Sequence, residues 1–291
     1  MKRMKILLIA AVFLSAASTS KADDSLEAIL AKLEAEANKS PVEQPVIMAT
    51  ELVTTPLFQL PDGVGFEVTA DYFGKYIWRG QNISDDPVFQ PGASLSWNGF
   101  TAAWWGSVDT TKINGNNGEF IEHDWSLDYS GDVPFIESVG YSVGVINYDF
   151  PSADDTTEVY LGFAFDLPLS PSVTVYWDVD DIKGTYASAG LGHSIENIAE
   201  LGSDMPIGMD IGLSLGWGSA SYNKGYWGST VKSGKLNDLA LSVSFPVEIR
   251  GWTVAPSLNY VTLLNNKIRK TDAFNQASDY FFAGISVSKS F

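Results

Sequence analysis

Apolar and polar residues alternate along most of the chain, from about residue 65 to its last residue. The pattern is clearest over Tyr280–Phe291, where every second side chain is apolar and most of the others are small and polar. Alternation with a period of two is typical of a β-strand, because successive side chains point to opposite faces of a sheet. We therefore predict a final strand over this segment. Its apolar face carries Phe281, Ala283, Ile285, Val287 and Phe291.

Eleven earlier segments show the same alternation, so we predict twelve strands. Two of them are joined by Asn98-Gly99, a dipeptide preferred in two-residue hairpin turns. The predicted strands before the last one are Gly65–Arg79, Phe89–Trp97, Phe100–Asp109, Glu119–Tyr129, Val139–Tyr148, Thr157–Asp166, Val173–Asp180, Tyr186–Glu196, Met209–Gly218, Asp238–Val247 and Trp252–Val261.

The connections between these strands are sorted by length. The two longest, residues 219–236 and 262–279, are both odd-numbered connections, whereas the tightest turn, residues 98–99, is an even-numbered one. An even number of strands with long loops at one end and short turns at the other is the pattern of bacterial outer-membrane barrels. We therefore predict an all-β fold, a 12-stranded antiparallel transmembrane β-barrel over residues 65–291, with both termini in the periplasm.

Composition supports this class of protein. Only 18% of the residues are charged, aromatic residues make up 13%, and glycine is abundant at 26 residues. Soluble domains usually contain about 25% charged residues. The absence of cysteine excludes disulfides and thiolate metal sites, and a net charge of −17 argues against nucleic acid as a partner. The sequence predicts no cofactor and no metal site.

The first 64 residues have a different pattern. Residues 1–22 combine a basic start, a short apolar run and small residues before Asp23, as in a cleaved signal peptide. Residues 23–39 have an apolar stripe at helical spacing and predict an amphipathic periplasmic helix. This helix could lie against the barrel, plug it, or mediate self-association into a homo-oligomer. Residues 40–64 contain four prolines and predict an extended linker.

The face that this register assigns to the lumen is acidic, with only two clear cations, Lys75 and Arg79. Because strand 7 lies opposite strand 1 in a ring of twelve, we expect Asp178 and Asp180 to face these cations across the bore. Charges of opposite sign on opposing walls would select among solutes by charge. The predicted luminal carboxylates are Glu67, Asp71, Asp109, Glu122, Asp124, Asp128, Glu158, Asp166, Asp178, Asp180 and Asp210.

Several stretches resemble one family, the TorF-type porins, also called the Gcw_chp outer-membrane proteins. Val68–Phe73 with Trp78–Ser84 is similar to the family's opening "DYxFRGxSxS", although residues 74–77 are extra here. Trp104–Asp109 resembles "WGSNVD", Thr157–Gly162 resembles "TEVYxG", and the ending Ser286–Phe291 matches as well. The resemblance covers about residues 65–291 and implies a barrel with a pore.

The sequence therefore favours an outer-membrane channel for passive diffusion of small hydrophilic solutes, with a preference for cations and no enzymatic activity. Twelve strands lie between barrels filled by side chains and wide channels, so a closed structural or surface-anchoring barrel is the alternative. A lipid hydrolase is a third, because His123 and His193 fall on the predicted lipid side.

Two further groups of residues suggest partners. We expect Phe291 to be part of the signal for the barrel-assembly machinery. Six cations in the two longest loops could bind phosphates of lipopolysaccharide in the outer leaflet, or could simply be solvated. These are Lys224, Lys232, Lys235, Lys267, Arg269 and Lys270.

Overall fold

A computed structural model describes residue 61 and residues 63–291, except residues 116, 137, 203, 204, 272 and 276. The predicted signal peptide, the predicted helix and nearly all of the predicted linker lie outside the described residues.

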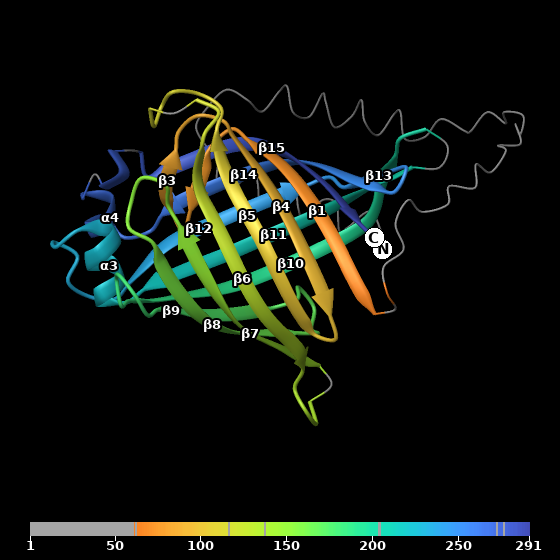
Figure 1. Cartoon of the computed structure of the whole chain (residues 1–291), viewed down its shortest axis with the longest axis horizontal. Coiled ribbons are helices and arrows are strands. Elements are labelled where there is room, and N and C mark those ends of the chain that lie inside the picture. The colour runs from red at the N-terminus through yellow and green to blue at the C-terminus, as the bar shows by residue number, and fades with distance from the viewer. Residues whose placement is uncertain are drawn as a thin grey trace, which may run out of the picture. The chain divides into compact units, whose positions relative to one another are not determined.

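The prediction of a closed antiparallel barrel with 12 strands is confirmed. Each strand pairs with its neighbours, and pairing of the first with the last closes the wall (Figure 1). The wall consists of β1 (Val64–Phe73), β4 (Val88–Trp97), β5 (Phe100–Asp109), β6 (Phe120–Asp132), β7 (Val139–Asp149), β8 (Thr156–Phe165), β9 (Ser172–Asp178), β10 (Thr185–Glu200), β11 (Pro206–Gly218), β12 (Lys235–Ser244), β14 (Trp252–Leu263) and β15 (Asp279–Ser290).

The alternation in the sequence corresponds to the two faces of this wall. Large apolar side chains point outward, and Trp97, Trp125 and Phe281 expose 59%, 56% and 65% of their surface. Acidic residues of the same strands point inward, and Glu122 and Glu158 expose only 3% and 1%. An apolar exterior around a polar interior is the reverse of a soluble globule and is typical of membrane barrels.

The first predicted strand is wrong in its extent. β1 ends at Phe73 rather than at Arg79, and the chain then forms a separate short hairpin of β2 (Tyr76–Trp78) and β3 (Gln81–Ser84). We call residues 76–84 the inserted hairpin. After it, the chain returns to the wall at β4, where Val88 is the cross-strand partner of Phe73.

The two ends of the barrel differ. We call the end where β1 begins and β15 finishes the terminal end, and the opposite one the far end. Figure 1 shows α3 (Ala220–Trp227) and α4 (Asn266–Arg269) at the far end and the C-terminus at the other. The short strand β13 (Val247–Ile249) lies in the connection between β12 and β14.

The far end has a small hydrophobic core of its own. Buried Trp227, Val231 and Ile268 from the two longest loops pack against Leu263 of β14, and Phe274 of the short helix η1 (Ala273–Asn275) packs against this cluster. The long connections are therefore folded against the barrel mouth. Among the described residues, no helix is long and apolar enough to cross a membrane.

Candidate functional site

The inserted hairpin is the feature that distinguishes the interior of this barrel. Its turn is Arg79-Gly80, and both residues have positive φ, at 49° and 82°. Asn98-Gly99, the hairpin turn predicted from the sequence, has nearly the same angles, at 49° and 87°. Two successive positive φ values define the turn whose twist matches a two-residue hairpin. Arginine is a rare choice at the first position, because its Cβ makes this conformation unfavourable.

The side chain of Arg79 explains this choice, since it forms a buried ion pair across the lumen. Its Nη1 and Nη2 atoms donate to the two carboxylate oxygens of Glu158 on β8, at 2.8 and 2.7 Å. The Arg79 side chain is 9% exposed and the Glu158 side chain 1%. Tyr148 of β7 donates a third hydrogen bond to the same carboxylate at 2.9 Å. A bidentate pair of this kind combines strength with fixed geometry.

Three aromatic rings surround the Arg79 guanidinium. Its Cζ lies 4.4 Å from the ring centroid of Trp78, 4.3 Å from that of Tyr176 and 4.4 Å from that of Tyr186. Because these rings belong to the hairpin, β9 and β10, the hairpin reaches the wall opposite β1. Cation–π contacts of this geometry are strengthened when water is excluded.

Other residues of the hairpin contact the rest of the circumference. Tyr76 packs against Trp105 of β5, with ring centroids 5.6 Å apart. Gln81 donates to the hydroxyl of Tyr222 in α3 at 3.1 Å. The hairpin is thus held on the β5 side and from the helix above it.

Gly80 faces the remaining part of the wall, at β12 and β14. A Cβ atom on this glycine would lie 2.7 Å from Leu263 Cδ2 and 2.9 Å from Asp238 Cβ. The glycine therefore allows close contact as well as the turn conformation. Together these contacts place the hairpin across the bore near the far end.

Cavities lie on both sides of the hairpin. A 210 Å³ cavity contains Arg79, Tyr176 and Asp238 in its lining, and a separate 230 Å³ pocket contains Trp78 and Tyr148. Towards the terminal end the lumen widens into spaces of 590 and 490 Å³, which are lined mainly by serine, glycine and other small residues. The barrel is therefore wide in its terminal half and narrow at the hairpin.

The predicted acidic lining is largely found in the interior. Glu122, Glu158 and Asp178 are buried, whereas Asp124 is partly buried and has one carboxylate oxygen without a hydrogen-bond partner. Asp71 is half-buried opposite Gln90, and Asp128 accepts a hydrogen bond from the Tyr160 hydroxyl. Among the described residues, Arg79–Glu158 is the ion pair of this interior, so the other carboxylates have no cationic side chain as a partner.

The expected arrangement of Lys75 and Arg79 on the wall opposite Asp178 and Asp180 is wrong, because both cations lie beyond the end of β1. Lys75 binds Asp85 within its own connection, and Arg79 binds Glu158. Asp178 instead accepts from the Thr156 hydroxyl at 2.8 Å and from the backbone N–H groups of residues 180 and 183. Asp180 is exposed and lies just beyond β9. The prediction failed because Arg79 lies at the turn of the inserted hairpin and not on the wall.

Sequence reasoning also missed several residues of this site. Tyr76 and Trp78 continue the apolar alternation of β1 in the sequence, a pattern typical of the outer face of a barrel, yet Tyr76 is 8% exposed and lies inside the barrel. Asp238, 3% exposed, accepts from the Tyr186 hydroxyl at 3.0 Å. The signals that point to the hairpin are Gly74, which interrupts the alternation, and the Arg79-Gly80 dipeptide.

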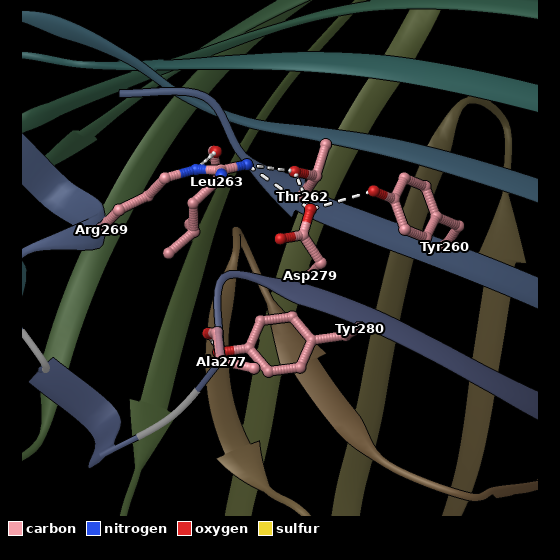
Figure 2. Close-up of polar contacts among 7 residues, drawn as sticks. All are labelled: Tyr260, Thr262, Leu263, Arg269, Ala277, Asp279 and Tyr280. Atoms are coloured by element: carbon pink, nitrogen blue, oxygen red, sulfur yellow. Dashed lines mark hydrogen bonds and ion pairs between the residues drawn. The ribbon is translucent and has the colours of Figure 1, made fainter. Parts of the chain in front are cut away.

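One of the six loop cations has a structural role (Figure 2). Arg269 donates to the Thr262 hydroxyl at 2.9 Å and forms a 3.4 Å ion pair with Asp279, which also accepts from Tyr260 at 3.0 Å. It therefore ties the loop between β14 and β15 to the strands at both of its ends. We call the other five cations the loop lysines. They are Lys224, Lys232, Lys235, Lys267 and Lys270.

Neither histidine lines the two cavities beside the inserted hairpin, although His193 lines the 590 Å³ space. His123 is stacked between aromatic rings, with centroids 4.4 Å from Phe120 and 6.1 Å from Trp104. His193 follows luminal Gly192 on β10 and is paired with Ile211. In the described part of the chain, no cluster of three or more histidine, aspartate or glutamate residues has the geometry of a metal site.

No family model and no curated protein matches this chain. Solved structures with a similar arrangement include LpxR from Salmonella typhimurium, at 10% identity and a TM-score of 0.44, covering 77% of this chain and 99% of that one. An outer membrane channel from Pseudomonas putida F1 has 10% identity and a TM-score of 0.43, covering 83% and 100%. The outer membrane protein OprD from Pseudomonas aeruginosa has 12% identity and a TM-score of 0.32, covering 78% and 65%.

Proposed function

We propose that this chain is a gated outer-membrane channel that passes small hydrophilic solutes and prefers cations. The single observation that carries the proposal is the contrast within the lumen. The terminal half holds spaces of 590 and 490 Å³ in which serine and glycine are the commonest lining residues, whereas the inserted hairpin crosses the far end. A barrel with a purely structural role would have no need of a wide interior behind a single separate hairpin.

The hairpin has the properties of a gate. It is a short two-stranded segment outside the wall, and it is joined to β1 and β4 at Phe73 and Val88. Because these two residues already pair across the sheet, the wall does not depend on the hairpin for closure. The hairpin could therefore move while the barrel stays intact.

The charge of the interior supports the cation preference. Buried carboxylates such as Glu122, Asp178 and Asp238 repel one another, and mobile cations would relieve that repulsion. The positive charge of Arg79 is already neutralised by Glu158, so the net charge of the interior stays negative. Cation preference should weaken as salt screens the walls.

The apolar exterior supports a location in the outer membrane, and the long loops at the far end support its facing outward, with the termini in the periplasm. In this orientation the hairpin closes the external mouth. The resemblance to the TorF-type porins is part of the same proposal, as are lipopolysaccharide and the barrel-assembly machinery as partners.

A closed barrel is the second candidate, and a specific observation favours it. The hairpin is held by a buried bidentate ion pair and by rings on both sides, which is what a permanent plug would need. The lipid-hydrolase alternative would be tested by phospholipid hydrolysis in vesicles, where we expect no release of fatty acid.

The proposed function is tested by reversal potential across a salt gradient in a planar bilayer. We expect openings that favour cations, a smaller preference after Asp178→Asn with Asp180→Asn, and a larger one after Lys75→Gln. Openings that favour anions would overturn the selectivity. The absence of openings in both the wild type and hairpin-destabilised variants would support the closed barrel.

A further inference from the structure

The 230 Å³ pocket on the far side of the hairpin has a lining unlike the rest of the lumen. Six of its lining residues are aromatic, and they come from the hairpin, β7 and its following loop, α3 and η1. By contrast, the cavities in the terminal half are lined mainly by serine, glycine and other small residues. The aromatic residues are Tyr76, Trp78, Tyr148, Phe150, Tyr226 and Phe274.

The charges in this pocket are all of one sign. Glu122 of β6, Asp154 and Asp181 contribute carboxylates to the lining, and the described lining contains no lysine or arginine. Glu122 is 3% exposed, so its charge lies deep in the pocket, while Asp154 and Asp181 are exposed at its rim. The pocket therefore combines aromatic walls with an uncompensated negative charge.

Trp78 separates this pocket from the cation already present. The Arg79 guanidinium lies 4.4 Å from the ring of Trp78 but lines the other cavity. Tyr148 and Tyr226 pack edge-on against Trp78, each with a centroid distance of 5.6 Å. Tyr148 in turn lies parallel to Phe150, with ring centroids 6.5 Å apart, so the rings that line the pocket differ in orientation.

We propose that this pocket binds a small organic ammonium ion and so defines the class of solute that the channel admits. Aromatic faces attract cations through the ring quadrupole, and cages of such rings are the usual receptors for quaternary ammonium groups. The carboxylate at the base would supply the countercharge. A hydrated inorganic cation would gain little from aromatic walls, and a neutral apolar molecule would gain nothing from the carboxylates of the lining.

The inference rests on the proposed channel function, because the pocket lies at the mouth that the hairpin closes. In the proposed orientation it is reached from outside before the hairpin. An ammonium ion bound there would contact Trp78 and Tyr76 of the hairpin, so occupancy and hairpin position would be linked.

The test is calorimetric titration of the full-length protein in detergent with choline, compared with its neutral isostere 3,3-dimethylbutan-1-ol. We expect choline to bind about 5- to 30-fold more tightly, the ratio that corresponds to a cation–π contribution of about 1–2 kcal/mol. Equal affinity for both molecules, or no binding of choline, would overturn the proposal.

Two variants locate the binding, and a matched control guards against general effects. Phe150→Leu removes a ring and Glu122→Gln removes the charge at nearly constant volume, and each should weaken choline binding by about fivefold or more. Trp125→Leu removes a ring from the outer wall, where the side chain is 56% exposed, and should leave affinity within about twofold. If the control weakens binding as much as Phe150→Leu, the pocket is not the site. Retention of the heat-modifiable gel shift would show that each variant is folded.

Conductance separates this inference from the proposed function. A channel that conducts but does not bind choline would overturn the pocket and leave the channel intact. Choline binding by a barrel that never conducts, even with the hairpin removed, would support the pocket as a ligand site and overturn the channel.

Discussion

The Arg79→Ala substitution tests whether the inserted hairpin is a gate. The substitution removes the guanidinium from between Trp78, Tyr176 and Tyr186 and leaves Glu158 buried without its cationic partner. Alanine keeps a Cβ at φ 49°, so the conformational cost of the turn remains. The change in hairpin stability therefore reflects the lost contacts of the guanidinium and the unpaired charge of Glu158.

The magnitude follows from the burial of the pair. Removing one partner of a buried ion pair costs about 3–5 kcal/mol, because the other charge stays uncompensated. That free energy corresponds to a shift of roughly a hundred- to several-thousand-fold in the ratio of closed to open hairpin. Adding Glu158→Gln to the variant should recover part of the closed population, since the stranded charge is then removed as well.

The control is the second ion pair at this hairpin, Lys75–Asp85, which has side-chain exposures of 24% and 40%. Pairs as exposed as this are worth about 0–1 kcal/mol, so Lys75→Ala should change the closed-to-open ratio by no more than about fivefold.

The assay is labelling of a single cysteine in intact cells. The natural chain has no cysteine, so Ser214→Cys, in the cavity on the terminal side of the hairpin, would be unique. An impermeant thiol reagent added outside should label it slowly in the wild-type background and much faster with Arg79→Ala. Equal labelling rates in a correctly folded barrel would refute the gate.

Three further predictions concern assembly, packing and the outer surface. Phe291→Ser should lower the fraction of heat-modifiable barrel on gels, because Phe291 exchanges backbone hydrogen bonds with Phe66 where β1 and β15 close the barrel. Unchanged assembly would place the assembly signal elsewhere in the chain. Gly184→Ala should lower the melting temperature, since the new Cβ would lie 2.5 Å from the backbone nitrogen of Tyr222, at an overpacking cost of about 1–3 kcal/mol. Gly140→Ala is the control and should be tolerated, because the nearest atom to its Cβ would be 3.8 Å away. Neutralising the five loop lysines while keeping Arg269 should increase sensitivity of cells to chelators of divalent ions if they bind lipopolysaccharide phosphate, and unchanged sensitivity would indicate solvated charges.

The wall could be predicted because its determinants are local. The period-two pattern depends only on which face of a strand points out of the barrel, and the Asn98-Gly99 turn depends only on two positive φ values. The lengths of the connections then distinguish the end of the barrel with long loops from the end with short turns. The alternation, the turn dipeptide and the connection lengths are all properties of short stretches of sequence. The twelve strands and their order could therefore be predicted directly from them.

The inserted hairpin could not be predicted in the same way, because its position depends on contacts distant in sequence. Tyr76 and Trp78 have the same alternation and the same residue types as an outward-facing strand. They turn inward because Arg79 forms an ion pair with Glu158, 79 residues later in the chain. Its guanidinium also packs against the rings of Tyr176 on β9 and Tyr186 on β10. Acidic residues could be assigned to the lumen from their register, but their pairing depended on that hairpin.

Removal of the hairpin is the most direct test of the channel. Because Phe73 and Val88 are cross-strand partners, residues 74–87 can be replaced by Asn-Gly, a two-residue turn that would join β1 to β4 without disturbing the wall. The measurement is conductance of this variant in a planar bilayer beside the wild type. We expect a steady, cation-preferring conductance in the variant and brief, infrequent openings in the wild type. A folded, heat-modifiable variant that passes no current would contradict the proposed channel function.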